Sequence, residues 1–293
     1  MTWGRPGVRV PYRALDMKNI AVLYHASCPD GFGGAYSAWK KLGSTADYIS
    51  VYHGTLPPDL AGKEVYIIDF SYPNGKMLQM EKSAKRLVVL DHHEGVEDEV
   101  RQVREHVYDA TRSGTGIAWE YFHPGTPVPR LLQYIQDADL WKWERPYAKE
   151  VAAFVGSLKF DFELFDPVVQ KADTEEGFAE IVSKGKAYKE YFDYVCDNII
   201  EQAQEIEFEG YNILAVSAPR LFRSAIGMRL AKIKGPLAIV YYPHHGKWHF
   251  SMRGDGSIDL SKVAQKHGGN GHPNSASFQL PLTSPLPFTF VKK

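Results

Sequence analysis

The chain has 293 residues, and its 34 Lys and Arg against 35 Asp and Glu give a formal net charge of −1. This balance provides no global basic field for long nucleic acid, although a local patch can still hold a small anion. The two cysteines, Cys28 and Cys196, provide no disulfide framework, and no apolar run reaches the length of a membrane span. We therefore expect a cytoplasmic protein without a membrane partner, long enough for two ordinary domains.

Residues 1–16 precede the first predicted strand. They contain Arg, Pro and Gly but lack the apolar segment of a secretory signal. Met17 is followed almost at once by a strand-like run and looks like a second start. We predict that residues 1–16 are a dispensable N-terminal extension.

Short apolar runs alternate with helix-like segments over the first half of the chain. Strands are predicted at residues 20–24, 48–52, 65–68 and 87–90. A glycine-rich loop precedes the first helix, and helices are predicted at residues 35–42, 76–84, 113–121 and 129–139, with Ser113 as an N-cap. This alternation predicts an α/β domain with a parallel, helix-covered sheet.

After Trp143 the pattern becomes mostly helical. Residues 177–207 are polar with one apolar face, which indicates a long connecting helix and leaves room for a homodimer. Beyond residue 212 strands and helices alternate again. The predicted domains are residues 17–175, a helical linker over residues 176–208 and a smaller α/β domain over residues 209–293.

Three predicted strands of the first domain end in ionisable side chains. His25, Asp69 and the tripeptide Asp91-His92-His93 each follow a strand, and Asp30 lies in the loop after His25. Each residue alone has a structural reading, such as a strand-end cap for His25. Because ligands bind beyond the carboxyl ends of parallel strands, we expect these side chains to share one site. Mixed imidazole and carboxylate ligands suit Mn²⁺, Mg²⁺ or Zn²⁺, and a cation would relieve the repulsion among converging carboxylates.

Four ordered motifs carry a resemblance to a known family. The segments HASCPDGFGGA, IIDF, VVLDHH and GGNGH resemble the DHH phosphoesterase superfamily, in the branch with a DHHA1 C-terminal domain. The nearest group is the oligoribonuclease and cyclic-nucleotide phosphodiesterase-like one, and the resemblance runs from about Ile20 to Phe278. It implies two α/β domains joined by a helical linker, with the active site in the cleft between them and two Mn²⁺ ions.

The resemblance also implies a role for each motif residue. His25, Asp30, Asp69, His92 and one aspartate of a later motif would be metal ligands, with Asp69 as the bridging carboxylate. Asp139 is favoured over Asp137 for that last ligand. The catalytic residues would be Asp91, which orients its neighbours from behind the ligands, and His93, which contacts phosphoryl oxygens or protonates the leaving group.

The first motif departs from the family pattern at Phe32, where many relatives have a second aspartate. Phenylalanine cannot bind a metal, so the second ion loses one expected carboxylate. The alternatives are one tight and one weak ion, or a neighbouring group that substitutes for the carboxylate. Cys28 lies beside the predicted site, where a small loop-filling role is favoured over a redox or Zn²⁺ role. The glycines after Asp30 are expected to form a flexible turn that opens a helix.

In the second domain, Arg253 follows a strand and can hold a phosphate bidentately. Gly268, Gly269, Gly271 and His272 resemble the substrate-binding glycine loop of DHHA1 domains. Asn270 replaces a glycine that is usual there, which would alter base or sugar preference while leaving phosphate binding intact.

We therefore predict a metal-dependent phosphoesterase that hydrolyses phosphodiester bonds of short single-stranded oligonucleotides or cyclic nucleotides by metal-activated water. Duplex nucleic acid would be excluded. The alternatives are a phosphomonoesterase or phosphoanhydride hydrolase acting on small nucleotides, and a nucleotide-binding regulator in which Phe32 marks lost catalysis.

Overall fold

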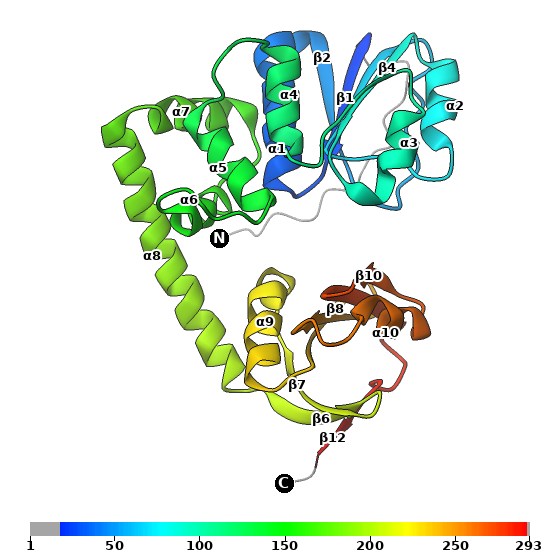
Figure 1. The fold of residues 1–293 in the computed structure, drawn as a ribbon, viewed down its shortest axis with the longest axis vertical. Coiled ribbons are helices and arrows are strands. Elements are labelled where there is room, and N and C mark those ends of the chain that lie inside the picture. Colours follow the sequence, from blue (N-terminus) through cyan, green and yellow to red (C-terminus); the bar gives the residue numbers. More distant parts are fainter. Residues whose placement is uncertain (1–17, 292–293) are drawn as a thin grey trace. The chain divides into compact units, whose positions relative to one another are not determined.

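The computed structural model describes residues 18–291 and divides into two compact units between Lys189 and Glu190 (Figure 1). The division falls inside the long helix α8, Glu175–Ile200. The domain limits expected from the sequence, the homodimer and the cleft between domains stay predictions. The predicted extension at residues 1–16 lies outside the described residues.

The described part of the first unit contains a parallel sheet of five strands in the order β2-β1-β3-β4-β5. The strands are β1 Ile20–His25, β2 Ala46–Val51, β3 Glu64–Ile68, β4 Arg86–Asp91 and β5 Glu105–Tyr108. This confirms the predicted α/β class. The sequence reading missed β5, whose residues alternate between exposed and half-buried and do not form an apolar run.

Helices cover both faces of this sheet (Figure 1). Leu23 of β1 packs on the face that buries Met77, whereas its neighbour Val22 packs on the face that buries Ile117. Because successive side chains of a strand alternate between faces, one apolar run serves both layers. The helices are α1 Pro29–Leu42 and α4 Gly114–Phe122 on one face, and α2 Lys76–Ser83 and α3 Glu97–Arg101 on the other.

Helix α1 begins at Pro29, six residues before the predicted start, so the expected glycine turn is wrong. The glycines lie inside the helix because neighbouring chain segments approach it closely. A Cβ at Gly31 would lie 2.5 Å from the carbonyl oxygen of His25, and one at Gly33 would lie 2.4 Å from Oγ1 of Thr115. Close packing thus decides the helix, overriding the low helix propensity of glycine.

A helical subdomain completes the first unit. Its helices are α5 Arg130–Asp139, α6 Ala148–Val155, α7 Phe162–Ala172 and the first part of α8. They surround an aromatic core in which Phe32 of α1 stacks on Phe160 and Phe162 and meets Phe165 edge-on. This core fixes α1, and therefore Asp30, against the helical subdomain.

The described part of the second unit is a mixed sheet in the order β10-β11-β9-β8-β7-β6-β12, in which β7 and β8 are parallel. Helix α9 covers one face and α10 the other, with Leu230 and Leu260 in separate cores. The elements are β6 Gln204–Phe208, β7 Tyr211–Ser217, α9 Arg223–Ile233, β8 Leu237–His244, β9 Lys247–Gly254, α10 Leu260–Lys266, β10 Asn270–His272, β11 Ser275–Pro281 and β12 Thr289–Phe290.

Part of the predicted glycine loop is a strand. Gly268 and Gly269 form a turn after α10, whereas Asn270–His272 pairs with β11 as β10. Gly269 approaches the backbone of that strand so closely that a Cβ would lie 2.2 Å from the carbonyl oxygen of Ser277. Among residues 18–291 we find no helix that is both long and apolar enough to cross a membrane.

Candidate metal centre

The strand order reverses between β1 and β3, which lie side by side although β2 comes between them in the chain. In open α/β sheets, ligands bind outside the carboxyl ends of the strands at such a switch point. His25 is the last residue of β1, and Asp69 directly follows β3. These two side chains therefore begin the candidate site.

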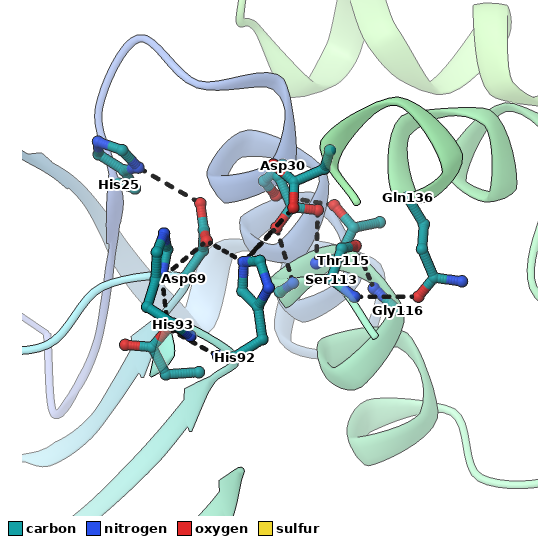
Figure 2. A network of polar contacts seen from close by, with 12 residues as sticks. His25, Asp30, Asp69, His92, His93, Ser113, Thr115, Gly116 and Gln136 are labelled. Carbon is teal, nitrogen blue, oxygen red and sulfur yellow. Dashed lines mark hydrogen bonds and ion pairs between the residues drawn. The ribbon is translucent and has the colours of Figure 1, made fainter. Parts of the chain in front are cut away.

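Asp69 lies between two imidazoles (Figure 2). Its Oδ1 is 3.2 Å from Nε2 of His92, and its Oδ2 is 3.4 Å from Nδ1 of His25. The backbone of Asp69 has φ 55°, a left-handed conformation that aspartate tolerates better than most residues. This turn at the end of β3 brings the carboxylate to the centre of the cluster, where it is 1% exposed.

Among the described residues, two buried atoms of this cluster form no hydrogen bond and meet in a 3.4 Å imidazole–carboxylate contact. They are Nδ1 of His25 and Oδ2 of Asp69, which face each other. Buried polar atoms are nearly always satisfied, so an unpartnered pair needs an explanation. A cation bound by both atoms would satisfy them, and the nitrogen and oxygen donors fit Mn²⁺, Mg²⁺ or Zn²⁺.

Asp30 is held in the first turn of α1 by the start of another helix. Its Oδ2 accepts a hydrogen bond from the amide of Gly114 at 2.7 Å, and its Oδ1 accepts one from the amide of Thr115 at 3.0 Å. The N-terminal end of α4 favours the negative charge. Ser113 caps this helix as predicted, with its Oγ accepting from the amide of Gly116.

Asp139 joins the cluster from the end of α5. Its Oδ2 is 3.4 Å from Nε2 of His92, which is also 3.8 Å from Oδ2 of Asp30. Asp137 points elsewhere, and its Oδ1 accepts a hydrogen bond from the amide of Glu144. The structure therefore places Asp139, and not Asp137, beside the histidines.

Asp91 is fully buried behind the histidines. Its Oδ1 accepts hydrogen bonds from the amide of His92 at 2.7 Å and from Nδ1 of His93 at 2.7 Å. Its Oδ2 accepts one from the hydroxyl of Ser71 at 2.6 Å. Asp91 is thus hydrogen-bonded to both histidines that follow it.

The carboxylates respond differently to their surroundings. Burial, and then the charges of Asp69 and Asp139, raise the pKa of Asp30 well above its ordinary value. Burial, and then the charge of Asp69, also raise the pKa of Asp139. Burial would raise the pKa of Asp69, but its contacts with His25 and His92 outweigh burial and lower its pKa below the ordinary value. The protein's own groups therefore leave part of this negative charge uncompensated, as expected where a cation binds.

The histidines become more basic in this environment. The hydrogen bond to Asp91, reduced by burial, raises the pKa of His93 to about 9. Burial would lower the pKa of His92, but its bond to Asp69 and the charge of Asp30 raise it. The side chain of His93 is 42% exposed, although its Nδ1 is bound to the buried carboxylate of Asp91.

Three overlapping sets of side chains bring ligand atoms within 4.8 Å of one another. The sets are His25, Cys28 and Asp69; Asp69, His92 and His93; and Asp30, His92 and Asp139. Phe32 is not among them, because its ring is 1% exposed inside the aromatic core. All the predicted metal ligands, together with Asp91 and His93, therefore lie in one cluster.

The predicted substrate-binding residues lie in the second unit. Arg253 of β9 is opposite Ser275 of β11, which is opposite His272 of β10. Directly opposite residues of antiparallel strands share a face, so Arg253 and His272 lie on the same face, two strands apart. In the described residues Arg253 forms no ion pair, and its guanidinium donates to the hydroxyls of Ser251 and Ser224. Arg253 and the glycine segment, which the sequence analysis treated as one substrate-binding region, are thus brought together by the pairing of their strands.

Three supporting residues were missed by the sequence reading. Ser71 follows β3 closely, and Gly114 and Thr115 begin α4; only the run Ser-Gly-Thr-Gly before an apolar helix hinted at the latter two. The guanidinium of Arg112 donates to the carbonyl of Gly116 and pairs with Glu120. Trp141 is 64% exposed.

A family model described as the DHHA1 domain matches residues 218–287. The chain is 27% identical to the uncharacterized protein R106 of Acanthamoeba polyphaga mimivirus, over 92% of this chain and 70% of that protein.

Two solved structures have a similar fold. One, described as the DHH domain of a member of a family of ribosomal proteins, gives a TM-score of 0.57 at 13% identity, covering 94% of this chain and 84% of that one. The other, the pGpG-specific phosphodiesterase PggH from Vibrio cholerae, gives 0.52 at 12% identity, covering 90% and 94%.

Proposed function

We propose that this chain, whose residues 218–287 match the DHHA1 domain model, is a member of the DHH superfamily and a Mn²⁺-dependent phosphodiesterase. Its substrates would be short single-stranded oligonucleotides or cyclic nucleotides. The observation that carries the proposal is the convergence of His25, Asp69 and His92 at the strand ends, where two buried ligand atoms form no hydrogen bond within the described residues.

The residues that would hold the cations are the cluster described above. Asp69 directs one carboxylate oxygen toward each side, so it is suited to bridge two cations. A divalent cation bound here would polarise the phosphoryl group and lower the pKa of a water molecule. Mn²⁺ is favoured over Zn²⁺ at the position of Asp30, His92 and Asp139, because two of its three ligands are carboxylates.

His93 would act on the substrate. Its Nδ1 is bound to Asp91, so the ring presents its other nitrogen, Nε2, for contact with a phosphoryl oxygen or the leaving group. The hydrogen bond to Asp91 raises the pKa of His93 to about 9, which favours an imidazole that can give a proton to a departing oxygen.

The second unit would bind the substrate through Arg253 and His272. Burial, and then the charge of Arg223, lower the pKa of Arg253, which fits a guanidinium that lacks its anionic partner. A phosphate would supply that partner and form bidentate hydrogen bonds. A near-neutral chain with a local arginine site suits short anionic substrates better than long duplexes.

The test is hydrolysis of a panel of substrates by the full chain, with and without Mn²⁺. The panel contains the dinucleotide pGpG, a five-nucleotide RNA, cyclic AMP, a cyclic dinucleotide, a 3′,5′-bisphosphonucleotide and pyrophosphate. We expect Mn²⁺-dependent cleavage of the phosphodiesters, abolished in Asp69→Ala.

Activity on the bisphosphonucleotide or pyrophosphate alone would replace the proposal with a phosphomonoesterase or phosphoanhydride hydrolase. Tight nucleotide binding without any turnover would instead identify a regulator. Unchanged activity in Asp69→Ala would show that the site assignment is wrong.

A further inference from the structure

Cys28 lies beside the unpartnered pair of the metal centre. It is the N-cap of α1, with an extended backbone at φ −122° and ψ 128°. Its sulfur, a nitrogen of His25 and a carboxylate oxygen of Asp69 lie within 4.8 Å of one another. A loop-filling role, expected from the sequence, does not account for a sulfur this close to two proposed ligand residues.

The two unpartnered atoms supply independent support. Within residues 18–291, Nδ1 of His25 and Oδ2 of Asp69 are buried without hydrogen bonds and contact each other at 3.4 Å, and Asp69 is 1% exposed. They therefore indicate a cation bound between His25 and Asp69, within reach of the Cys28 sulfur. Two donors alone would hold a cation weakly, whereas three protein donors and one open position are common in catalytic zinc sites.

Phe32 explains why a third donor is needed from elsewhere. Its ring is stacked between Phe160 and Phe162, so position 32 contributes nothing to the metal centre. Cys28 lies four residues earlier, on the other side of Asp30 in the chain, and its side chain reaches the position next to His25.

We infer that Cys28, His25 and Asp69 form a three-ligand position for a thiophilic divalent cation such as Zn²⁺ or Co²⁺. This position lies next to the one formed by Asp30, His92 and Asp139, whose oxygen-rich donors suit Mn²⁺ or Mg²⁺. The inference rests on the metal site of the proposed function and gives its two positions different metal preferences.

Cys28 can bind a cation only as a thiolate. Burial, and then the charges of Asp69 and Asp30, raise the pKa of the thiol, so it carries its proton in the absence of a cation. On coordination the sulfur forms a bond to the cation as a thiolate, and the proton passes to bulk water. No oxidation step is involved.

The experiment is Co²⁺ titration of the full-length protein under anaerobic, reducing conditions. Thiolate-to-cobalt charge transfer gives a near-ultraviolet absorption band that nitrogen and oxygen ligands do not produce, and bound cobalt is quantified by elemental analysis. Cys28→Ser should fold, because serine is a favoured N-cap. Cys196→Ala is the matched control, since Cys196 is a buried thiol packed in the core beside α9 of the second unit.

We expect the band to saturate at one equivalent of cobalt in the wild type and in Cys196→Ala, and to be absent in Cys28→Ser. Zn²⁺ affinity should fall by about tenfold or more in Cys28→Ser, with little change for Mn²⁺. Stoichiometric cobalt binding without a band in the wild type, or an unchanged band in Cys28→Ser, would overturn the role of Cys28 and leave the proposed phosphodiesterase intact. Failure of the wild type to bind any cobalt, zinc or manganese would overturn both proposals.

Discussion

Asp91 and His93 are joined by a hydrogen bond of 2.7 Å between Oδ1 and Nδ1, although only one residue separates them in the chain. The same oxygen also accepts hydrogen bonds from the backbone amides of His92 and His93. One buried carboxylate therefore fixes both the backbone turn after β4 and the orientation of an imidazole. Such orientation reduces the freedom that a catalytic ring must lose before reaction.

Ser71 completes the surroundings of Asp91. Replacing it with alanine leaves Oδ2 of Asp91 buried without a donor, which should cost about 1–3 kcal/mol of stability and lower kcat through misorientation of His93. Thermal unfolding and steady-state kinetics measure the two effects. Ser83→Ala is the control, because that hydroxyl bonds only backbone carbonyls of its own helix. A variant with wild-type melting temperature and kcat would show that Ser71 does not support Asp91.

Asp139 and Asp137 form a natural matched pair on one helix. Asp139→Asn should weaken Mn²⁺ binding by more than the factor of about 10–100 that is typical of residues behind the ligands. Asp137→Asn should change it little, because an asparagine oxygen can still accept the amide of Glu144. Calorimetric titration with Mn²⁺ distinguishes them. Equal losses in both variants would mean that Asp139 has no direct role at the cation.

Gly114 allows α4 to approach two carboxylates. A Cβ there would lie 2.5 Å from Cβ of Asp69 and 2.9 Å from Oδ2 of Asp30. Gly114→Ala should therefore displace both ligands, lower metal affinity and cost about 1–3 kcal/mol through overpacking. Gly95→Ala provides the comparison, since a Cβ at Gly95 meets no atom within 4 Å. Metal titration and thermal unfolding of both variants test this, and similar behaviour would refute the packing argument.

Arg253 is expected to act through substrate binding. Its replacement by glutamine removes a charged hydrogen-bond donor worth about 1.5–3 kcal/mol, so KM should rise by roughly tenfold or more while kcat changes less. Arg229→Gln serves as a control, because that guanidinium is paired with Asp193 and Asp197. A fall in kcat with unchanged KM would assign Arg253 a different role.

Glu209 anchors the end of α10, just before the glycine segment. The hydrogen bond from Lys266, and a further one from His267, lower the pKa of Glu209 below its ordinary value of 4.5. The resulting stabilisation is present above pH 4.5 and is lost as the pH falls through the lowered value. Solvent screening limits it to about 1 kcal/mol or less. Glu209→Gln should lower the melting temperature at neutral pH but not at strongly acidic pH, and a difference that persists in acid would contradict this account.

The sequence by itself determined the sheet class and the groups gathered at its edge. Three apolar runs end in His25, Asp69 and Asp91-His92-His93. Their meeting can be predicted without knowing any distant contact, because the carboxyl ends of parallel strands lie at the same edge of a sheet. The cap at Ser113 was equally readable, since it depends on neighbouring residues only.

Tertiary structure decided the features that depend on residues far apart in the chain. Helix α1 runs through glycines because His25 and Thr115 press against it, which overrides local propensity. The sequence analysis favoured Asp139 over Asp137, and only the tertiary structure shows that Asp139 lies 3.4 Å from His92 while Asp137 accepts the amide of Glu144. Cys28 gained its place beside His25 and Asp69 from the packing of the first turn of α1, a contact that the spacing of residues along the chain does not encode.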